Sequence, residues 1–371
     1  MAPPRRIVVA LDSFKGSIGA AAACAALRDG WLSARPDDVV TELPMADGGE
    51  GTRDAFERAL PGARRMPVTV AGPHGRAVEA SWLLLPPTAD APQGTGVVEL
   101  ASTSGIELLA GDLRPWDADT TGFGQAIAAA LDHGVSKLVL GIGSSASTDG
   151  GIGMLRALGA RVTRSDGSPV AAGARGLVDV AHVDLSGLRP LPAGGVVVLA
   201  DVTNPLVGPR GAAAVFGPQK GLAPHSIHRV DRALAAYAAA VGAAADVPGT
   251  GAAGGTGFAL TLWGARLLPG APEVAALVGL SSAVADADLV VTGEGSFDGQ
   301  SAAGKVPAFV GALAADLGVP VALVAGRIAP DADVSAFAAT ASLTDLAGTA
   351  EASQAEPARW LRDAAASLAP R

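Results

Sequence analysis

Lysines next to glycines are the first residues that suggest chemistry. The chain has 23 arginines but only 4 lysines, and three of these lysines adjoin a glycine: Lys15, Lys220 and Lys305. Since arginine serves as the cation elsewhere, lysine in a glycine loop indicates a need for a compact ammonium group, the form in which lysine meets phosphate. Chance placement among the 49 glycines is the alternative.

The first such loop is Asp12-Ser13-Phe14-Lys15-Gly16-Ser17, between a predicted strand and a predicted helix. It offers a carboxylate, hydroxyl groups, an ammonium group and the N–H groups of a helix N-terminus, which favour an anion. An ordinary helix cap with a solvated Lys15 is the alternative. Ser13 and Lys15 are therefore candidate phosphate ligands.

A second loop, Asp47-Gly48-Gly49-Glu50, follows the predicted strand Val39–Leu43. Its glycines let a ligand approach the backbone closely, while its carboxylates can reach Mg²⁺ or a substrate hydroxyl. A plain Asp-Gly hairpin turn is the alternative, but the helical pattern of residues 52–60 does not suit a hairpin. We therefore favour a ligand-binding role for this loop.

A third loop, residues 141–151, combines glycines with hydroxyl side chains after another predicted strand. Backbone N–H groups and hydroxyls in such a loop form a nest for phosphate oxygens, with Gly143, Ser144, Ser145 and Ser147 as candidates. The loop lacks the third glycine of the dinucleotide fingerprint, so it gives little support to a nicotinamide-binding site. A purely structural glycine turn remains an alternative.

Two further loops follow predicted strands. In the fourth, residues 201–221, Asp201 and Asn204 suit metal or hydroxyl contacts, while Gln219 and Lys220 suit phosphate oxygens. The fifth, residues 293–305, carries Glu294 and Asp298 and ends at Lys305. Its last residues have P-loop glycine and lysine spacing, but Val306 replaces the required Ser or Thr, so a Walker motif is rejected.

The elements that must position these loops alternate between strands and helices. Buried strands are predicted at Arg6–Leu11, Val39–Leu43, Val97–Leu100, Lys137–Gly141, Val196–Ala200, Leu289–Thr292 and Val321–Ala325. Helices are predicted at Ala20–Ala34, Gly122–Asp132, Ile227–Ala244, Ala302–Leu317 and Glu356–Leu368. This alternation is typical of an α/β fold with mostly parallel sheets, whose ligands bind at the carboxyl ends of the strands.

Length and one irregular segment predict two α/β domains. A chain of 371 residues exceeds the usual size of one core. Val68–Val70 and Val78–Leu85 flank a turn and read as an antiparallel hairpin, which interrupts the alternation. We predict a discontinuous Rossmann-like parallel-sheet domain, residues 1–67 plus 281–371, and an inserted α/β domain, residues 68–280, with the active site in the cleft between them.

Composition excludes several classes of protein. The net charge of −9 and the absence of a basic stripe argue against a nucleic acid or an anionic membrane as partner. The single cysteine, Cys24, cannot form an internal disulfide, and no apolar run is long enough to span a membrane. The sequence therefore predicts a soluble cytoplasmic protein with small-molecule ligands.

Taken in order, these loops resemble those of the bacterial type 1 glycerate kinase family. The match runs over nearly the whole chain, at residues 12–17, 46–52, 141–151, 201–206, 216–221, 292–295, 298–301 and 304–307. Ser144 and Thr148 stand where the family usually has glycine and asparagine, and Phe123 and Gln125 also depart from its pattern. The resemblance implies two α/β domains, ATP, Mg²⁺, D-glycerate as acceptor and phosphorylation at O2, giving 2-phosphoglycerate.

The resemblance to a kinase family allows each candidate residue to be assigned an expected role in ATP binding, acceptor binding, metal binding or catalysis. Lys15, Lys220 and Lys305 are assigned to phosphate, together with Ser13, Gly143, Ser144, Ser145, Ser147 and Gln219 as ATP-binding residues. The acceptor is assigned to Asp47, Gly48, Gly49, Glu50, Asn204, Glu294 and Asp298, and the metal to Asp201, Glu294 and Asp298. Lys15 and Lys220 are also expected to act in catalysis.

Several alternatives stay open. Either Asp47 or Asp201 is expected to be the base, and Arg210 or Arg327 could hold the carboxylate of the acid. The residues alone also leave open the acceptor hydroxyl and the oligomeric state. Other functions are a kinase for another small sugar or hydroxy acid, an NAD-dependent hydroxy-acid dehydrogenase, and a ligand-binding protein without turnover.

Overall fold

The structure is a computed structural model that describes residues 3–49, 51–299 and 305–369. The chain divides into two compact units, each of which is discontinuous in sequence. Unit 1 consists of Met1–Asp47, Asp54–Pro61 and Pro269–Arg371, and unit 2 of Gly48–Arg53 and Gly62–Leu268.

Unit 1 is built on a sheet of parallel strands. Among the residues described there, five strands pair in the order β13-β12-β11-β1-β2. They are β1 (Arg6–Leu11), β2 (Val39–Glu42), β11 (Leu289–Phe297), β12 (Val321–Ile328) and β13 (Ala339–Ser342). Because β1 lies between β2 and β11, the chain changes direction across the sheet there, and such a switch point leaves a ligand-binding crevice at the carboxyl ends of the strands.

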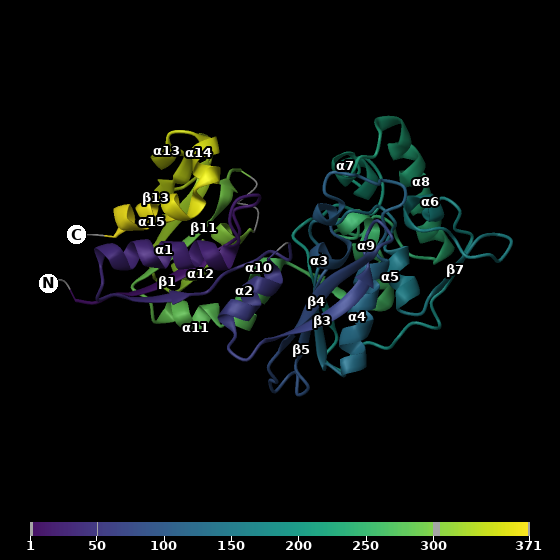
Figure 1. Cartoon of the computed structure of the whole chain (residues 1–371), viewed down its shortest axis with the longest axis horizontal. Helices are drawn as coiled ribbons and strands as arrows, with labels where there is room; N and C mark the ends of the chain where they lie inside the picture. Colours follow the sequence, from purple (N-terminus) through teal and green to yellow (C-terminus); the bar gives the residue numbers. More distant parts are fainter. Residues whose placement is uncertain (1–2, 50, 300–304, 370–371) are drawn as a thin grey trace. The chain divides into compact units, whose positions relative to one another are not determined.

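Eight helices lie wholly or mainly in the described part of unit 1. They are α1 (Ala20–Ala34), α2 (Thr52–Ala59), α10 (Gly270–Val278), α11 (Leu280–Ala285), α12 (Val306–Asp316), α13 (Leu343–Ala347), α14 (Ala350–Ala355) and α15 (Pro357–Leu368). Helices α1 and α15 lie side by side (Figure 1). Their contact requires Gly30, because a Cβ there would lie 2.3 Å from the backbone oxygen of Arg362.

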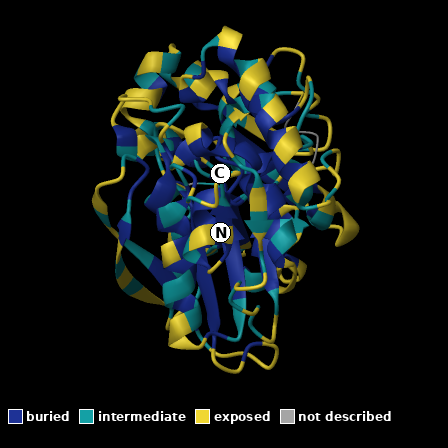
Figure 2. Ribbon diagram, turned by 90° about the vertical axis from the view of Figure 1, so that its right-hand side faces the viewer, coloured by how far each residue is buried: buried dark blue, intermediate teal, exposed yellow. Residues whose placement is uncertain are grey.

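The core of unit 1 contains apolar side chains of strand β1 packed with those of helix α1. Ile7, Val9 and Leu11 point from β1 toward Leu27 and Trp31 of α1, and all five are buried. Figure 2 shows buried strands in the interior and most of the exposed positions on helices and loops. The buried apolar side chains hold the end of β1 in place and therefore position the loop that follows it.

Unit 2 contains a mixed sheet. In the part of the chain that is described, its order is β10-β9-β6-β5-β4-β3, and a separate pair joins β7 to β8. The strands are β3 (Arg64–Ala71), β4 (Ala77–Leu85), β5 (Thr95–Glu99), β6 (Lys137–Gly141), β7 (Arg161–Thr163), β8 (His182–Asp184), β9 (Val196–Leu199) and β10 (Arg266–Leu268). β5, β6, β9 and β10 are parallel, while β3 and β4 form the predicted antiparallel hairpin.

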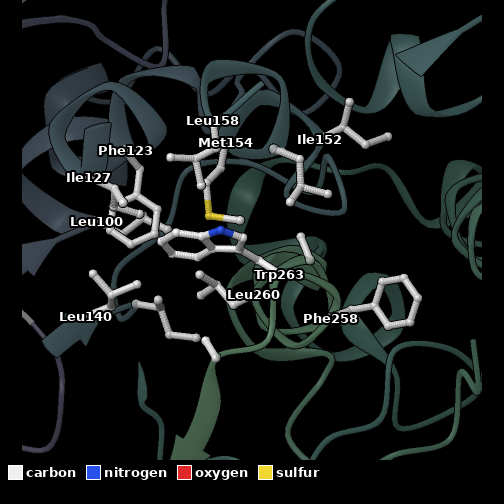
Figure 3. Packing of buried hydrophobic residues seen from close by; sticks show 14 of the residues in the cluster. Leu100, Phe123, Ile127, Leu140, Ile152, Met154, Leu158, Phe258, Leu260 and Trp263 are labelled. Atoms are coloured by element: carbon white, nitrogen blue, oxygen red, sulfur yellow. The ribbon is translucent and has the colours of Figure 1, made fainter. Parts of the chain in front are cut away.

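The helical segments of unit 2 pack around a large apolar core. They are α3 (Ala101–Ser104), η1 (Ile106–Leu109), α4 (Thr121–His133), α5 (Ile152–Ala157), α6 (Gly173–Leu177), α7 (Ala212–Phe216), η2 (Pro218–Lys220), α8 (Pro224–Ala240) and α9 (Ala252–Trp263). In Figure 3 the Met154 side chain reaches toward the Trp263 indole, amid Leu140, Leu158 and Leu260. The indole N–H donates to the Arg189 carbonyl at 2.8 Å, so this large ring is buried without losing its hydrogen bond.

The prediction of an α/β fold with mostly parallel sheets is confirmed. None of the helices in the described ranges is both long enough and apolar enough to cross a membrane.

Candidate functional site

A cavity of about 320 Å³ lies at the carboxyl ends of the strands of unit 1. Its wall comes from the loops after β1 and β2, from β11 and β12, and from α13 and α14. Six candidate site residues that the sequence analysis named line it: Ser13, Lys15, Asp47, Glu294, Lys305 and Arg327. Residues that are far apart in the sequence meet here because parallel strands end at the same edge of the sheet.

Both lysines of the cavity face a carboxylate. Lys15 Nζ lies 3.8 Å from Asp47 Oδ2, and Lys305 Nζ lies 3.8 Å from Glu294 Oε2. The Lys15 side chain is 78% exposed. Since an exposed pair of this kind contributes at most about 1 kcal/mol, an anionic ligand can compete for the ammonium group.

Asp12 adds a buried carboxyl group to the same wall. The Ser13 N–H donates to its Oδ1 at 2.6 Å. The pKa of Asp12 is raised to about 8, mainly by burial and next by the Asp47 carboxylate; Glu294 adds a smaller rise, while the Ser13 N–H and Lys15 oppose it. The cavity therefore holds several carboxyl groups in a partly desolvated space, which favours a cationic or proton-donating ligand group nearby.

The predicted metal ligands are divided between the two units. Within the described ranges, no three His, Cys, Asp or Glu side chains have metal-binding spacing. Of the predicted metal ligands, Glu294 lines the cavity; Asp298 follows β11 but is not part of the cavity wall. Asp201 is exposed after β9 in unit 2, and Glu50 lies outside the described residues.

In unit 2, residues 48–49 pack against the glycine-serine loop, residues 141–151. The Gly143 N–H donates to the Gly48 carbonyl at 3.1 Å. A Cβ at position 143 would lie 2.5 Å from the Gly49 Cα, and one at position 48 would lie 2.5 Å from the Leu199 carbonyl. The two backbones approach so closely that only glycine fits at these positions.

Lys220 is buried beneath the glycine-serine loop, with 3% of its surface exposed. Its Nζ donates to Ser145 Oγ and to the Ser147 carbonyl, both at 2.6 Å. Burial lowers the pKa of Lys220 to about 7, and the Asp149 carboxylate partly offsets this effect. In this structure the Lys220 amine therefore supports the loop from inside.

Asp149 completes this internal framework. Its carboxylate accepts hydrogen bonds from the Thr120 N–H and hydroxyl, the Ser147 hydroxyl, and the Gly151 and Gly153 N–H groups, at 2.8–3.2 Å. Such a set of donors stabilises a buried carboxylate that would otherwise be very costly. Sequence analysis gave Asp149 no role, although its place between Thr148 and Gly150 in the loop was visible.

The tip of the loop differs from its interior. Ser144 is exposed and has φ 57°, the left-handed region that is unfavourable for a residue other than glycine. Gln219 is exposed as well, and the Asn204 amide donates to the Arg210 carbonyl at 2.7 Å. The side chains of Ser144 and Gln219 therefore remain accessible to a ligand, whereas Ser145, Ser147 and Lys220 are buried.

Sequence reasoning missed one wall of the unit 1 cavity. Thr344, Ser353 and Gln354 belong to α13 and α14, and all three line the cavity. They follow β13, whose sequence Ala-Thr-Ala-Ser lacks the large apolar residues that mark a buried strand. Because β13 was not predicted, the sequence offered no reason to place α13 and α14 at the carboxyl edge of the sheet.

Comparisons with known proteins agree on one family. The model of the glycerate kinase family matches residues 7–371. Glycerate 2-kinase of Escherichia coli K12 is 40% identical to this chain, over 89% of this chain and 87% of the relative. Glycerate kinase of Bacillus subtilis 168 is 41% identical, over 88% of this chain and 86% of the relative. A crystal structure described as glycerate kinase 2 from Salmonella typhimurium LT2 has a TM-score of 0.82 and 38% identity, covering 99% of this chain and 98% of that one.

Proposed function

The chain belongs to the glycerate kinase family, and from this premise we propose that it transfers the γ-phosphoryl group of ATP to D-glycerate, giving 2-phosphoglycerate. One observation in the structure carries the proposal: lysines and carboxyl groups converge in a cavity at the switch point of the unit 1 sheet. Phosphoryl transfer requires mainly the positioning of reactants and the neutralisation of phosphate charge, and this set of groups can supply both.

Lys15 and Lys305 are the proposed phosphate-binding cations. Both extend from loops at the carboxyl edge of the sheet, and each can exchange its carboxylate neighbour for a phosphate oxygen. Asp47 is the proposed base, which accepts the proton of the acceptor hydroxyl. This role is supported by the position of Asp47 in the cavity wall, beside Lys15. Asp201, in unit 2, remains the alternative candidate for the base.

A divalent cation fits the acidic side of this cavity. Burial, and next the nearby Asp47 carboxylate with a smaller contribution from Glu294, raises the pKa of Asp12, and a bound cation would relieve the repulsion between these carboxyl groups. Mg²⁺ is usually held by one or two carboxylates, waters and substrate phosphates, so a larger protein cluster is not required. Asp12 and Glu294 are the residues that would hold it, and when bound it supplies positive charge to the phosphate oxygens.

In unit 2, the glycine-serine loop is the proposed nest for nucleotide phosphate. The exposed Ser144, at the tip of the loop beside the half-buried Gly143, and the exposed Gln219 would contact the phosphate oxygens. Lys220 and Ser147 would hold the loop in shape from below, since their polar groups are already engaged there. An acidic protein with these small ligands fits the cytoplasm, the location that we propose.

The direct test is turnover. Purified protein is incubated with ATP, Mg²⁺ and D-glycerate, ADP release is coupled to an optical readout, and NMR identifies the product. We expect 2-phosphoglycerate. Formation of 3-phosphoglycerate would contradict the proposed acceptor hydroxyl, and turnover with a different hydroxy acid alone would contradict the proposed substrate.

A further inference from the structure

Arg327 differs from the other cations of the unit 1 cavity. It lies near the carboxyl end of β12, beside Ser296 in the register with β11, and its side chain is exposed in the cavity wall. Lys15 and Lys305 each face a carboxylate, but Arg327 has no ion-pair partner among residues 3–49, 51–299 and 305–369. Its guanidinium group is therefore a positive charge that the protein leaves available in the cavity.

The wall next to Arg327 is held firmly by its own hydroxyl groups. Thr344 Oγ1 donates to the Gly326 carbonyl at 2.8 Å, and Ser353 Oγ donates to the Ala350 carbonyl at 2.8 Å. Trp360 Nε1 donates to the Ala352 carbonyl at 3.1 Å, which ties α14 to α15. Because these donors are engaged within the protein, they shape the wall and are not its main ligand-binding groups.

Gln354 is a second polar residue of the cavity wall near Arg327 to be considered. Its backbone carbonyl accepts a hydrogen bond from Ser17 Oγ at 3.4 Å, which links α14 to the loop after β1. Gln354 is exposed and lines the cavity, and its side-chain amide makes no hydrogen bond within the described part of the chain. Arg327 and Gln354 thus present donors toward the cavity from the side built by β12 and α14.

The size of the cavity indicates the size of its ligand. Its volume of about 320 Å³ lies at the lower end of the usual range for ligand pockets, roughly 300–1,000 Å³. This volume suits a small organic acid better than a whole nucleotide. A guanidinium group offers a planar pair of donors that matches a carboxylate, which an ammonium group cannot do.

We propose that Arg327, assisted by Gln354, binds the carboxylate of the acceptor acid in the unit 1 cavity and so restricts the acceptor to hydroxy acids. The inference rests on the proposed function, because it names the subsite of that same acceptor. A phosphate oxygen of the nucleotide offers similar chemistry to a guanidinium group, so the test separates the two ligands.

The test compares steady-state kinetics of Arg327→Met, Arg327→Lys and Gln354→Leu with the unaltered chain. Loss of one charge-assisted contact is expected to raise KM for D-glycerate about 10- to 150-fold in Arg327→Met, with KM for ATP changed by less than about twofold. Arg327→Lys should recover part of the loss because it keeps the charge without the paired donors. Gln354→Leu should raise the same KM by a smaller factor.

Arg362→Met is the matched control, since Arg362 is exposed on α15 of the same unit and does not line the cavity. It should leave both KM values unchanged. A rise in KM for ATP alone in Arg327→Met would assign the guanidinium to phosphate and overturn the proposal. A rise in KM for D-glycerate in Arg210→Met but not in Arg327→Met would also overturn it, in favour of the loop after β9.

Failure of the proposed function is a separate result. If the unaltered chain phosphorylates another hydroxy acid but not D-glycerate, the same variants are measured with that acid. A selective rise in its KM in Arg327→Met would still support the carboxylate subsite. Equal turnover of an acid and of the corresponding alcohol by the unaltered chain would refute the subsite, whichever acid is the substrate.

Discussion

Replacing Lys220 by methionine should change how the stability of the protein depends on pH. The Lys220 side chain is 3% exposed, and burial lowers its pKa from 10.5 to about 7. Between these two values the unfolded chain keeps a proton on this lysine that the folded chain has released. Stability rises with pH wherever the unfolded state binds more protons, so this lysine should make the unaltered protein more stable as the pH increases from about 7.

The magnitude follows from the same values. One proton difference changes the free energy of unfolding by about 1.4 kcal/mol per pH unit, and the gap of roughly 3.5 pH units corresponds to about 5 kcal/mol over the whole window. Methionine removes this titration. It also leaves the Ser147 carbonyl without its donor, at a cost of about 1–3 kcal/mol that does not depend on pH.

Urea unfolding between pH 7.5 and 9.5 measures the effect, with tryptophan fluorescence and far-UV circular dichroism recorded together to detect separate transitions. The free energy of unfolding of the unaltered protein should rise relative to that of Lys220→Met by about 2–3 kcal/mol across this range. Lys137→Met, at the start of β6, should retain the rise. Parallel curves for the unaltered protein and Lys220→Met would refute the reasoning that this lysine titrates inside the fold.

Three further predictions concern the site residues. Lys15→Ala and Lys305→Ala should each lower kcat/KM about 10- to 150-fold in the coupled ADP assay, and Lys137→Ala should not; equal losses in all three would contradict the assignment. Asp12→Asn should lower kcat but, in metal-free buffer, stabilise the protein increasingly as pH rises from about 4 to 8. Over that window the folded carboxyl group holds a proton that the unfolded chain releases, and this titration costs the unaltered protein stability. Ser144→Gly should raise stability by about 1 kcal/mol in thermal unfolding, because it removes a side chain at φ 57°, while KM for ATP rises; an unchanged KM would exclude the Ser144 hydroxyl from phosphate binding.

Local patterns were sufficient to predict most of the elements that carry the sites. Strands β1 and β6 have the predicted bounds, and β11 begins at the predicted Leu289. Each is a short run of β-branched and aliphatic residues that is buried in a sheet, and such runs are recognisable without tertiary information. The end of β11 was predicted too early, since it continues through Glu294 to Phe297, where glycine and polar residues hide the pattern.

One short segment belongs to unit 2 because of contacts between residues that are far apart in the sequence. Residues 48–53 belong to unit 2, although the chain on both sides of them belongs to unit 1. They stay there because Gly48 and Gly49 fit against Leu199 at the end of β9 and Gly143 after β6, and because the Arg53 N–H donates to Glu99 Oε1 at 2.7 Å. Neither contact has a signature in the local sequence, which shows only a glycine pair before a helix.

The candidate residues divide into ligand-facing and supporting groups in a way that residue type does not determine. Lys15 and Lys220 both stand before a glycine in a polar loop, yet one side chain is largely exposed and the other is buried. The difference arises because the Lys220 side chain runs beneath residues 145–147, where the Ser147 carbonyl and the Asp149 carboxylate partly offset its desolvation. A lysine in a glycine loop can thus be an exposed cation or an internal support of the loop, and only the surrounding fold decides which of the two it is.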